Sequence, residues 1–83
     1  MAYNITYKSS VRRDLKAIGK AEAHRILDQL EKDLSRAPDK CPALKGAFEG
    51  LRKYRVGNYR VIFVMLGKDV LVLRIGHRKD VYR

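Results

Sequence analysis

The chain has 83 residues, of which 46% are hydrophobic, and its 19 Lys and Arg against nine Asp and Glu give a net charge of +10. A chain of this length buries only about 60–65% of the surface exposed when unfolded, so we expect one domain over residues 1–83 with a modest core and little room for a deep pocket. The excess of positive charge predicts an anionic partner: nucleic acid, an anionic membrane or an acidic protein.

The start of the chain and its cysteine content indicate a cellular location. "MAYNITYK" lacks the apolar core of a signal peptide, and no apolar run approaches membrane-spanning length. The single cysteine, Cys41, cannot form an internal disulfide and is interpreted as a small buried or loop residue. A reducing cytoplasm is therefore the expected location, with no membrane as partner.

The first half of the chain predicts one strand and two helices. Residues 3–7, "YNITY", alternate as a strand does. Ser9 and Ser10 are suitable N-caps for a helix over about residues 10–18, and Gly19 is suited to end it. A longer helix is predicted over about residues 20–36, so the two helices should form a hairpin. Their apolar stripes are predicted to be core: Val11, Leu15, Ile18, Ala23, Ile26, Leu27, Leu30 and Leu34.

The second half predicts a three-stranded meander after a loop rich in Pro and Gly. Strand-like segments cover residues 51–56, 59–66 and 69–75, and Gly57-Asn58 and Gly67-Lys68 separate them as two-residue turns. The expected fold is α+β: a mainly antiparallel sheet of about four strands with the N-terminal two-helix hairpin packed on one face.

Two-residue turns also predict a register. A two-residue turn at Gly57-Asn58 would place Val56 opposite Tyr59, Arg55 opposite Arg60 and Lys53 opposite Ile62. A two-residue turn at Gly67-Lys68 would place Leu66 opposite Asp69, Ile62 opposite Leu73 and Arg60 opposite Ile75. Opposite residues share a face. The predicted helix-facing side carries Tyr54, Val56, Tyr59, Val61, Phe63, Met65, Val70 and Val72, with Arg52 and Arg74 as exceptions. The other side would carry the remaining cations and an exposed apolar strip of Ile62, Val64, Leu71 and Leu73, with Ile75.

Positive charge is expected to converge where the last strand ends. Residues 1–44 have a net charge of +3, and residues 45–83 have +7. Lys53, Arg55 and Arg60 cluster at one end of the open face, and the tail "HRKDVYR" starts beside them. Arg guanidinium groups can donate paired hydrogen bonds to phosphate oxygens, and a Tyr or His ring can stack on a base. The cluster therefore indicates a phosphate site. Solvated surface cations are the alternative interpretation.

The chemistry open to such a site needs neither metal nor cofactor, since the sequence has no plausible metal constellation. RNA supplies its own nucleophile, the 2′-OH, and fixed cations can stabilise the charge on the reacting phosphate. Lys53 is a candidate base, because the positive charges of Arg55 and Arg60 disfavour a further proton there. Arg60 and Arg78 are candidate charge stabilisers, and Tyr82, His77 or Arg78 could assist the leaving group.

Three motifs, "LKG" (44–46), "LRKYRVGNYRVIF" (51–63) and "IGHRKDVY" (75–82), together resemble the RelE/ParE toxin superfamily, and the resemblance extends over the whole chain. It implies the toxin of a type II toxin–antitoxin pair, most similar to RelE-type enzymes that cut mRNA in the ribosomal A site without a metal, by 2′-OH attack, leaving a 2′,3′-cyclic phosphate. Lys53 would be the general base, Arg60 and Arg78 the catalytic arginines, and Tyr82 the substrate-orienting tyrosine. The remaining cationic residues of the patch and tail would bind RNA: Arg55, His77, Lys79 and Arg83.

The sequence departs from the best-studied RelE type in two places. Leu51 stands where that type has a further Lys, and the spacing from Arg78 to Tyr82 is shorter. Two other functions stay open: a ParE-like inhibitor of gyrase, and a non-catalytic module that binds RNA or the ribosome. The expected protein partner is a RelB-like antitoxin, whose acidic, partly helical segment would cover or displace the tail or lie along the apolar strip.

Overall fold

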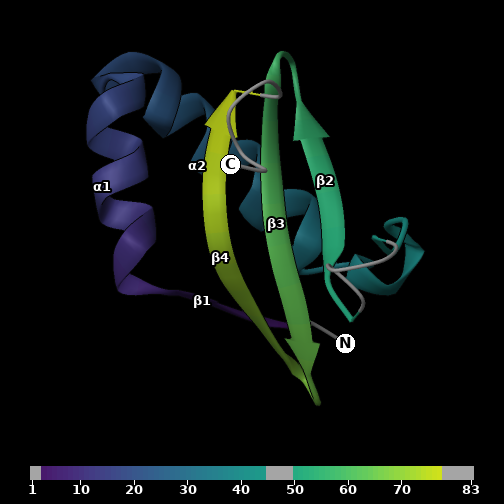
Figure 1. The fold of residues 1–83 in the computed structure, drawn as a ribbon. Coiled ribbons are helices and arrows are strands. Elements are labelled where there is room, and N and C mark those ends of the chain that lie inside the picture. Colours follow the sequence, from purple (N-terminus) through teal and green to yellow (C-terminus); the bar gives the residue numbers. More distant parts are fainter. Residues whose placement is uncertain (1–2, 45–49, 78–83) are drawn as a thin grey trace.

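The computed structural model describes residues 3–44 and 50–77, which form one four-stranded sheet and two helices (Figure 1). In chain order the elements are β1 (Asn4–Tyr7), α1 (Ser9–Ile18), α2 (Lys20–Leu34), the short 3-10 helix η1 (Pro38–Lys40), β2 (Arg52–Val56), β3 (Tyr59–Leu66) and β4 (Asp69–His77). The strand order is β1-β4-β3-β2, and only β1 and β4 run parallel. The predicted α+β class, with both helices on one side of the sheet, is confirmed.

The helical hairpin begins differently from the prediction. Lys8, with extended backbone, is the N-cap residue of α1, and no side chain caps the helix. The expected serine cap is therefore wrong: Ser9 and Ser10 lie inside the first turn, and the Ser10 hydroxyl donates to the carbonyl of Leu73 at 2.9 Å. Gly19 separates the helices as predicted, with a φ of 105° that favours glycine. α2 ends at Leu34, before the predicted end.

The register of β2 against β3 is confirmed. Arg55 lies opposite Arg60, Lys53 opposite Ile62 and Val56 opposite Tyr59. The reversal at Gly57 has a φ of 59°, as a tight two-residue hairpin turn requires at its first position. The three cations at this end of the hairpin are therefore held on one face by backbone pairing.

The register of β3 against β4 is confirmed only next to the turn. Leu66 lies opposite Asp69, but a β-bulge between Ile62 and Phe63 changes the pairing, so Ile62 lies opposite Arg74 and Arg60 opposite Gly76. The predicted partners, Leu73 and Ile75, were wrong because Leu73 is an extra residue on β4. Beyond the bulge alternate side chains change face, and Ile75 turns into the core with 1% of its surface exposed.

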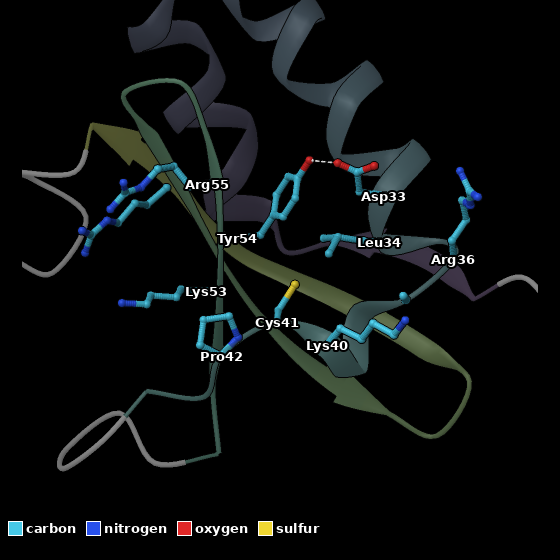
Figure 2. Close-up of a pocket in the computed structure, with 11 residues that line it drawn as sticks. Asp33, Leu34, Arg36, Lys40, Cys41, Pro42, Lys53, Tyr54 and Arg55 are labelled. Carbon is cyan, nitrogen blue, oxygen red and sulfur yellow. Dashed lines mark hydrogen bonds between the residues drawn. The ribbon is translucent and has the colours of Figure 1, made fainter.

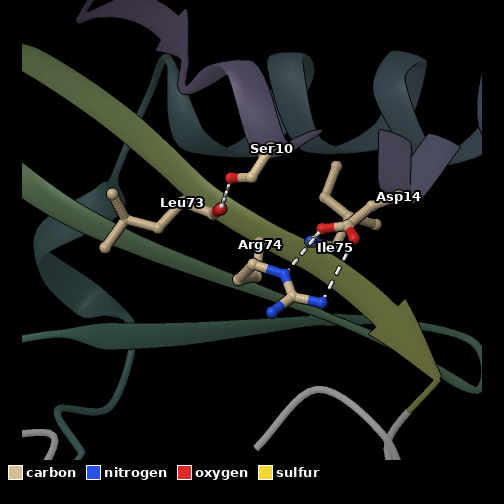
Figure 3. A network of polar contacts seen from close by, with 5 residues as sticks. All are labelled: Ser10, Asp14, Leu73, Arg74 and Ile75. Carbon is tan, nitrogen blue, oxygen red and sulfur yellow. Dashed lines mark hydrogen bonds and ion pairs between the residues drawn. The ribbon is translucent and has the colours of Figure 1, made fainter. Parts of the chain in front are cut away.

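Side chains of α1 hold the bulged part of β4 (Figure 3). β1 pairs with β4 only from Asp69 to Val72. Beyond that point Ser10 binds the Leu73 carbonyl, and the Asp14 carboxylate accepts from the Ile75 amide at 3.0 Å. The same carboxylate accepts from Arg74 Nε and Nη2 at 2.9 and 3.2 Å. The helix thus satisfies backbone groups that β1 is too short to reach.

Replacing Asp14 with alanine is expected to lower the free energy of unfolding by about 1–3 kcal/mol, because the part-buried Ile75 amide loses its acceptor and Arg74 loses its ion pair. Urea denaturation measures the loss, and amide hydrogen exchange should accelerate at Ile75. Asp28→Ala is the control, since Asp28 is exposed on α2 and its carboxylate lies 3.5 Å from the imidazole of the equally exposed His24. Unchanged exchange at Ile75 would show that the carboxylate does not hold the bulge.

The core lies between the helices and one face of the sheet. Ten residues form its buried cluster: Val11, Ile26, Leu30, Leu34, Val56, Val61, Phe63, Val70, Val72 and Ile75. All of them except Ile75 belong to the apolar helix stripes or to the helix-facing side of the sheet that the sequence predicted. The strip predicted to be exposed on the other face is largely covered: Ile62 is 4% exposed, and Val64, Leu71 and Leu73 are half-buried.

Candidate functional site

Three cationic side chains meet at the hairpin of β2 and β3. Lys53 and Arg55 come from β2 and Arg60 from β3, and all three line a pocket of about 610 Å³ at the outer edge of β2. Figure 2 shows Lys53 and Arg55 extending in the same direction from the strand. The strand pairing places Arg60 on this face as well. The predicted convergence of these three residues is therefore present, in a larger cavity than the chain length led us to expect.

Two cations of this cluster, Lys53 and Arg55, can bind an anion. Among residues 3–44 and 50–77, neither Lys53 nor Arg55 forms an ion pair with a carboxylate. Like charges directly opposite each other, as Arg55 and Arg60 are, destabilise a sheet by several tenths of a kcal/mol. A bound phosphate would remove that repulsion and gain paired hydrogen bonds from the guanidinium forks.

The opposite wall of the pocket comes from the end of α2 and the segment after it, and the sequence did not predict it. Tyr54 points away from Lys53 and Arg55 and donates its hydroxyl to Asp33 (Figure 2). The rest of the wall consists of Leu34, Arg36, Ala37, Lys40, Cys41 and Pro42. The pocket therefore joins a cationic side to a mixed, partly apolar side across the edge of one strand.

Backbone pairing fixes that wall beside β2. The Lys53 amide donates to the Pro42 carbonyl at 3.1 Å, and the Leu44 amide donates to Leu51 at 2.8 Å. Arg52 Nη1 donates to the carbonyls of Asp39 and Cys41, at 3.1 and 2.7 Å. Arg52, an exception in the predicted face pattern, thus ties the segment to the strand. A cation among alternating apolar residues was the one sequence signal for this contact.

Three groups of this wall have pKa values shifted from their ordinary range. The hydrogen bonds from Tyr54 and then Gln29 lower the pKa of the Asp33 carboxyl. Burial, followed by the bond to Asp33, raises the pKa of the Tyr54 hydroxyl, and burial raises that of the Cys41 thiol. Near neutral pH the wall therefore presents an ionised Asp33, a protonated Tyr54 and a protonated Cys41.

Tyr54→Phe is expected to raise the pKa of Asp33, because the largest cause of its lowering is removed. A lowered folded-state pKa stabilises the fold above the unfolded value near pH 4, and this contribution is lost as pH falls through the folded value. The stability difference between wild type and variant should therefore shrink on acidification. A carboxyl NMR titration gives the pKa, and an unchanged Asp33 value would contradict the assigned cause.

The end of β4 lies beside the cluster, but the His77 side chain is on the other face. Gly76 lies opposite Arg60, so the chain does pass the cations as predicted. His77 lies opposite Tyr59, with the two rings edge to face at 6.0 Å, and lines a cavity that α1 also borders. The structure therefore does not bring the His77 ring to Lys53. Four further predicted site residues lie outside the described residues: Arg78, Lys79, Tyr82 and Arg83.

The described part of the chain contains neither a metal-binding cluster nor a membrane-spanning helix. No group of three or more His, Cys, Asp or Glu side chains is placed to hold a metal ion between residues 3–44 and 50–77. Within the same ranges no helix has the length and apolar character needed to cross a membrane.

Comparison with known proteins gives concordant matches over nearly the whole chain. The model of a family described as the ParE toxin of the type II toxin–antitoxin system parDE matches residues 5–82. Toxin RelG of Mycobacterium tuberculosis is 29% identical over 86 residues, covering 100% of this chain and 99% of the relative.

Two solved complexes contain a similar fold. The toxin–antitoxin complex RelBE2 of M. tuberculosis has a chain that matches with a TM-score of 0.87 and 26% identity, covering 96% of this chain and 95% of that one. The archaeal RelE–RelB complex of Pyrococcus horikoshii has one that matches with a TM-score of 0.67 and 26% identity, covering 98% and 100%.

Proposed function

The chain belongs to the ParE toxin family of type II toxin–antitoxin systems, within the RelE/ParE superfamily that its motifs predicted, and we propose that it is a metal-independent endoribonuclease that cleaves mRNA in the ribosomal A site. The observation that carries this proposal is the convergence of Lys53, Arg55 and Arg60 on one pocket. Two guanidinium groups and an ammonium can pair with the oxygens of a phosphodiester.

The proposed reaction begins at the ribose next to the scissile phosphate. Lys53, acting as base, accepts the proton of the 2′-OH while the 2′-oxygen forms a bond to phosphorus. The bond from phosphorus to the 5′-oxygen breaks, and that oxygen takes up a proton from the solvent, to which Lys53 afterwards returns the proton that it accepted. The products are a 2′,3′-cyclic phosphate and a 5′-hydroxyl end. Arg60 stabilises the added negative charge, and the resemblance assigns Arg78 and Tyr82 to the same step.

The surroundings of Arg60 support this role. Its neighbour on β4 is Gly76, which has no side chain to occupy the face beside the guanidinium. Its neighbour on β2 is Arg55, so a phosphate placed here meets two arginines from adjacent strands. Backbone pairing fixes the positions from which both side chains extend, so both guanidinium groups can reach one phosphate and stabilise its developing charge.

A gyrase inhibitor is the second candidate, because the matching family model is that of a ParE toxin. Inhibition through protein contact would not require Lys53, Arg60, Arg78 and Tyr82 as a set. The two functions therefore differ in which substitutions abolish toxicity.

We propose a RelB-like antitoxin as the protein partner, since the complexes of two relatives contain an antitoxin or RelB. Its acidic, partly helical segment would lie over the cations or along the half-buried Val64, Leu71 and Leu73. Exposed charges are screened by salt, so affinity should fall as ionic strength rises if the cations dominate binding.

The deciding experiment adds the protein to programmed ribosomes and maps mRNA ends by primer extension. New ends spaced by codons, absent with Lys53→Ala, Arg60→Ala, Arg78→Ala and Tyr82→Phe, would support the endoribonuclease. DNA breaks in the presence of gyrase, without RNA ends, would assign the ParE-like activity. Ribosome binding without either product would leave a non-catalytic binding module.

A further inference from the structure

The pocket at the edge of β2 is larger than a phosphate needs. Its volume of about 610 Å³ lies within the roughly 300–1,000 Å³ typical of small-molecule sites. Lys53, Arg55 and Arg60 account for one side only. The remaining space lies against the end of α2 and the segment from Ala37 to Pro42, so a ligand held by the cations would extend over this second wall.

The second wall suits a flat, partly apolar group with polar edges. The partly exposed Tyr54 ring offers apolar surface together with Ala37, Cys41 and Pro42, and the fully buried Leu34 lies behind them. Asp33 Oδ2 accepts bonds from Tyr54 and from Gln29, whereas Oδ1 accepts none from the described residues. Arg36 and Lys40 add two more cations at the rim.

We propose that this wall is a base-binding subsite, which receives the base of the nucleotide adjoining the scissile phosphate. The inference rests on the proposed function and extends it to the substrate: unstacked, single-stranded RNA. An unstacked base covers apolar surface with its ring faces and bonds through its edges. Asp33 would accept from an exocyclic amino group, so adenine, cytosine or guanine is favoured over uracil. Arg36 and Lys40, both exposed and lining the pocket, would bind a further phosphate of the same strand.

An acidic peptide is the competing occupant, and Asp33 disfavours it. Asp33 is ionised near neutral pH, as an aspartate ordinarily is, and the hydrogen bonds from Tyr54 and Gln29 lower its pKa further. An acidic side chain beside it would meet like charge in a partly enclosed site, where repulsion is stronger than in water. A base has no such charge and offers N–H groups to the same oxygens.

Cys41 makes the occupancy of this wall measurable, because it is the only cysteine in the chain and is partly exposed in the pocket. The rate of thiol modification would be measured on the full chain, alone, with inorganic phosphate, and with ApA blocked by a 2′-O-methyl group. We expect the dinucleotide to slow modification several-fold and phosphate to leave the rate unchanged. The phosphate sample thereby controls for any effect of a bound negative charge on the reactivity of the Cys41 thiol.

Two other outcomes would overturn the subsite. If NMR shows the dinucleotide bound at Lys53 and Arg55 while Cys41 reacts at its free rate, the base lies elsewhere and the endoribonuclease stands. If a Glu- and Leu-rich peptide protects Cys41 and the dinucleotide does not, the wall binds protein. Protection by ApA without any mRNA cleavage in the ribosome assay would instead retain the subsite and reject the proposed enzyme.

Filling the pocket gives an independent check. Ala37→Phe should weaken ApA binding several-fold and leave phosphate binding intact, whereas Ala21→Phe, at an exposed position of α2, should change neither. Asp33→Asn should reduce the preference for ApA over UpU while the thermal midpoint reports that the fold is retained. Equal ApA affinity in Ala37→Phe and wild type would overturn the proposal.

Discussion

Arg60→Ala is expected to reduce mRNA cleavage about a hundredfold to a thousandfold, the effect typical of removing one preorganised group that stabilises developing charge. Arg60 comes from β3, the central strand of the hairpin and meander, and lies between Arg55 and Gly76. Without Arg60, the reacting phosphate would have no guanidinium group on the side of β3. Single-turnover cleavage on programmed ribosomes, followed by primer extension, measures the change in rate.

Matched variants separate this effect from loss of net charge. Arg13→Ala removes one positive charge from the exposed side of α1 and should leave the cleavage rate unchanged. Arg60→Lys keeps the charge but loses the bidentate geometry, so an intermediate rate is expected. If Arg60→Ala cleaves as fast as Arg13→Ala, the cluster does not stabilise the transition state.

The part of the site that the sequence predicted depends on local geometry. The turn at Gly57 has two residues, and a two-residue turn fixes the pairing of both flanking strands. The positions of Lys53, Arg55 and Arg60 relative to that turn therefore suffice to place all three on one face. Similar reasoning placed Gly76 close to Arg60, although it named Ile75 as the residue directly opposite.

The error on β4 arose from an interaction between distant segments. A bulge at Leu73 moves Ile75 into the core, and the groups that hold it are Ser10 and Asp14 on α1. The alternation of apolar residues along β4 does not indicate the bulge, because Leu73 and Ile75 are both apolar and either could face the core. Bonds from helix side chains to strand backbone depend on how α1 packs on the sheet, which the local pattern of either segment does not specify.

The second wall of the pocket was missed for a related reason. Its residues follow α2, in a segment that reads as a loop rich in proline, and their role depends on lying along β2. Arg52 secures that contact through the carbonyls of Asp39 and Cys41. The position of Arg52 among apolar residues interrupts the strand pattern but does not identify its partners, so the pocket could not be inferred from composition or spacing.

Phe63→Ala is expected to have the largest effect on stability, lowering the free energy of unfolding by about 3–5 kcal/mol. Phe63 is fully buried, with 0% of its surface exposed, in the core cluster to which both helices and strands β2, β3 and β4 contribute. The substitution removes its ring contacts and leaves a cavity. Against a typical stability of about 5–15 kcal/mol, the variant should melt at a much lower temperature, measured by circular dichroism.

Val64→Ala is the matched comparison, because Val64 is the next residue on β3 and lies half-buried on the opposite face. Val64→Ala should lower the free energy of unfolding by clearly less than Phe63→Ala does. The two substitutions should also differ in their effect on cleavage. Phe63→Ala should cleave mRNA at temperatures where it is folded, because Lys53 and Arg60 are intact. Arg60→Ala should stay impaired at every temperature. Cleavage that remained lost in folded Phe63→Ala would mean that the bulge beside Phe63 sets the geometry of the cationic cluster.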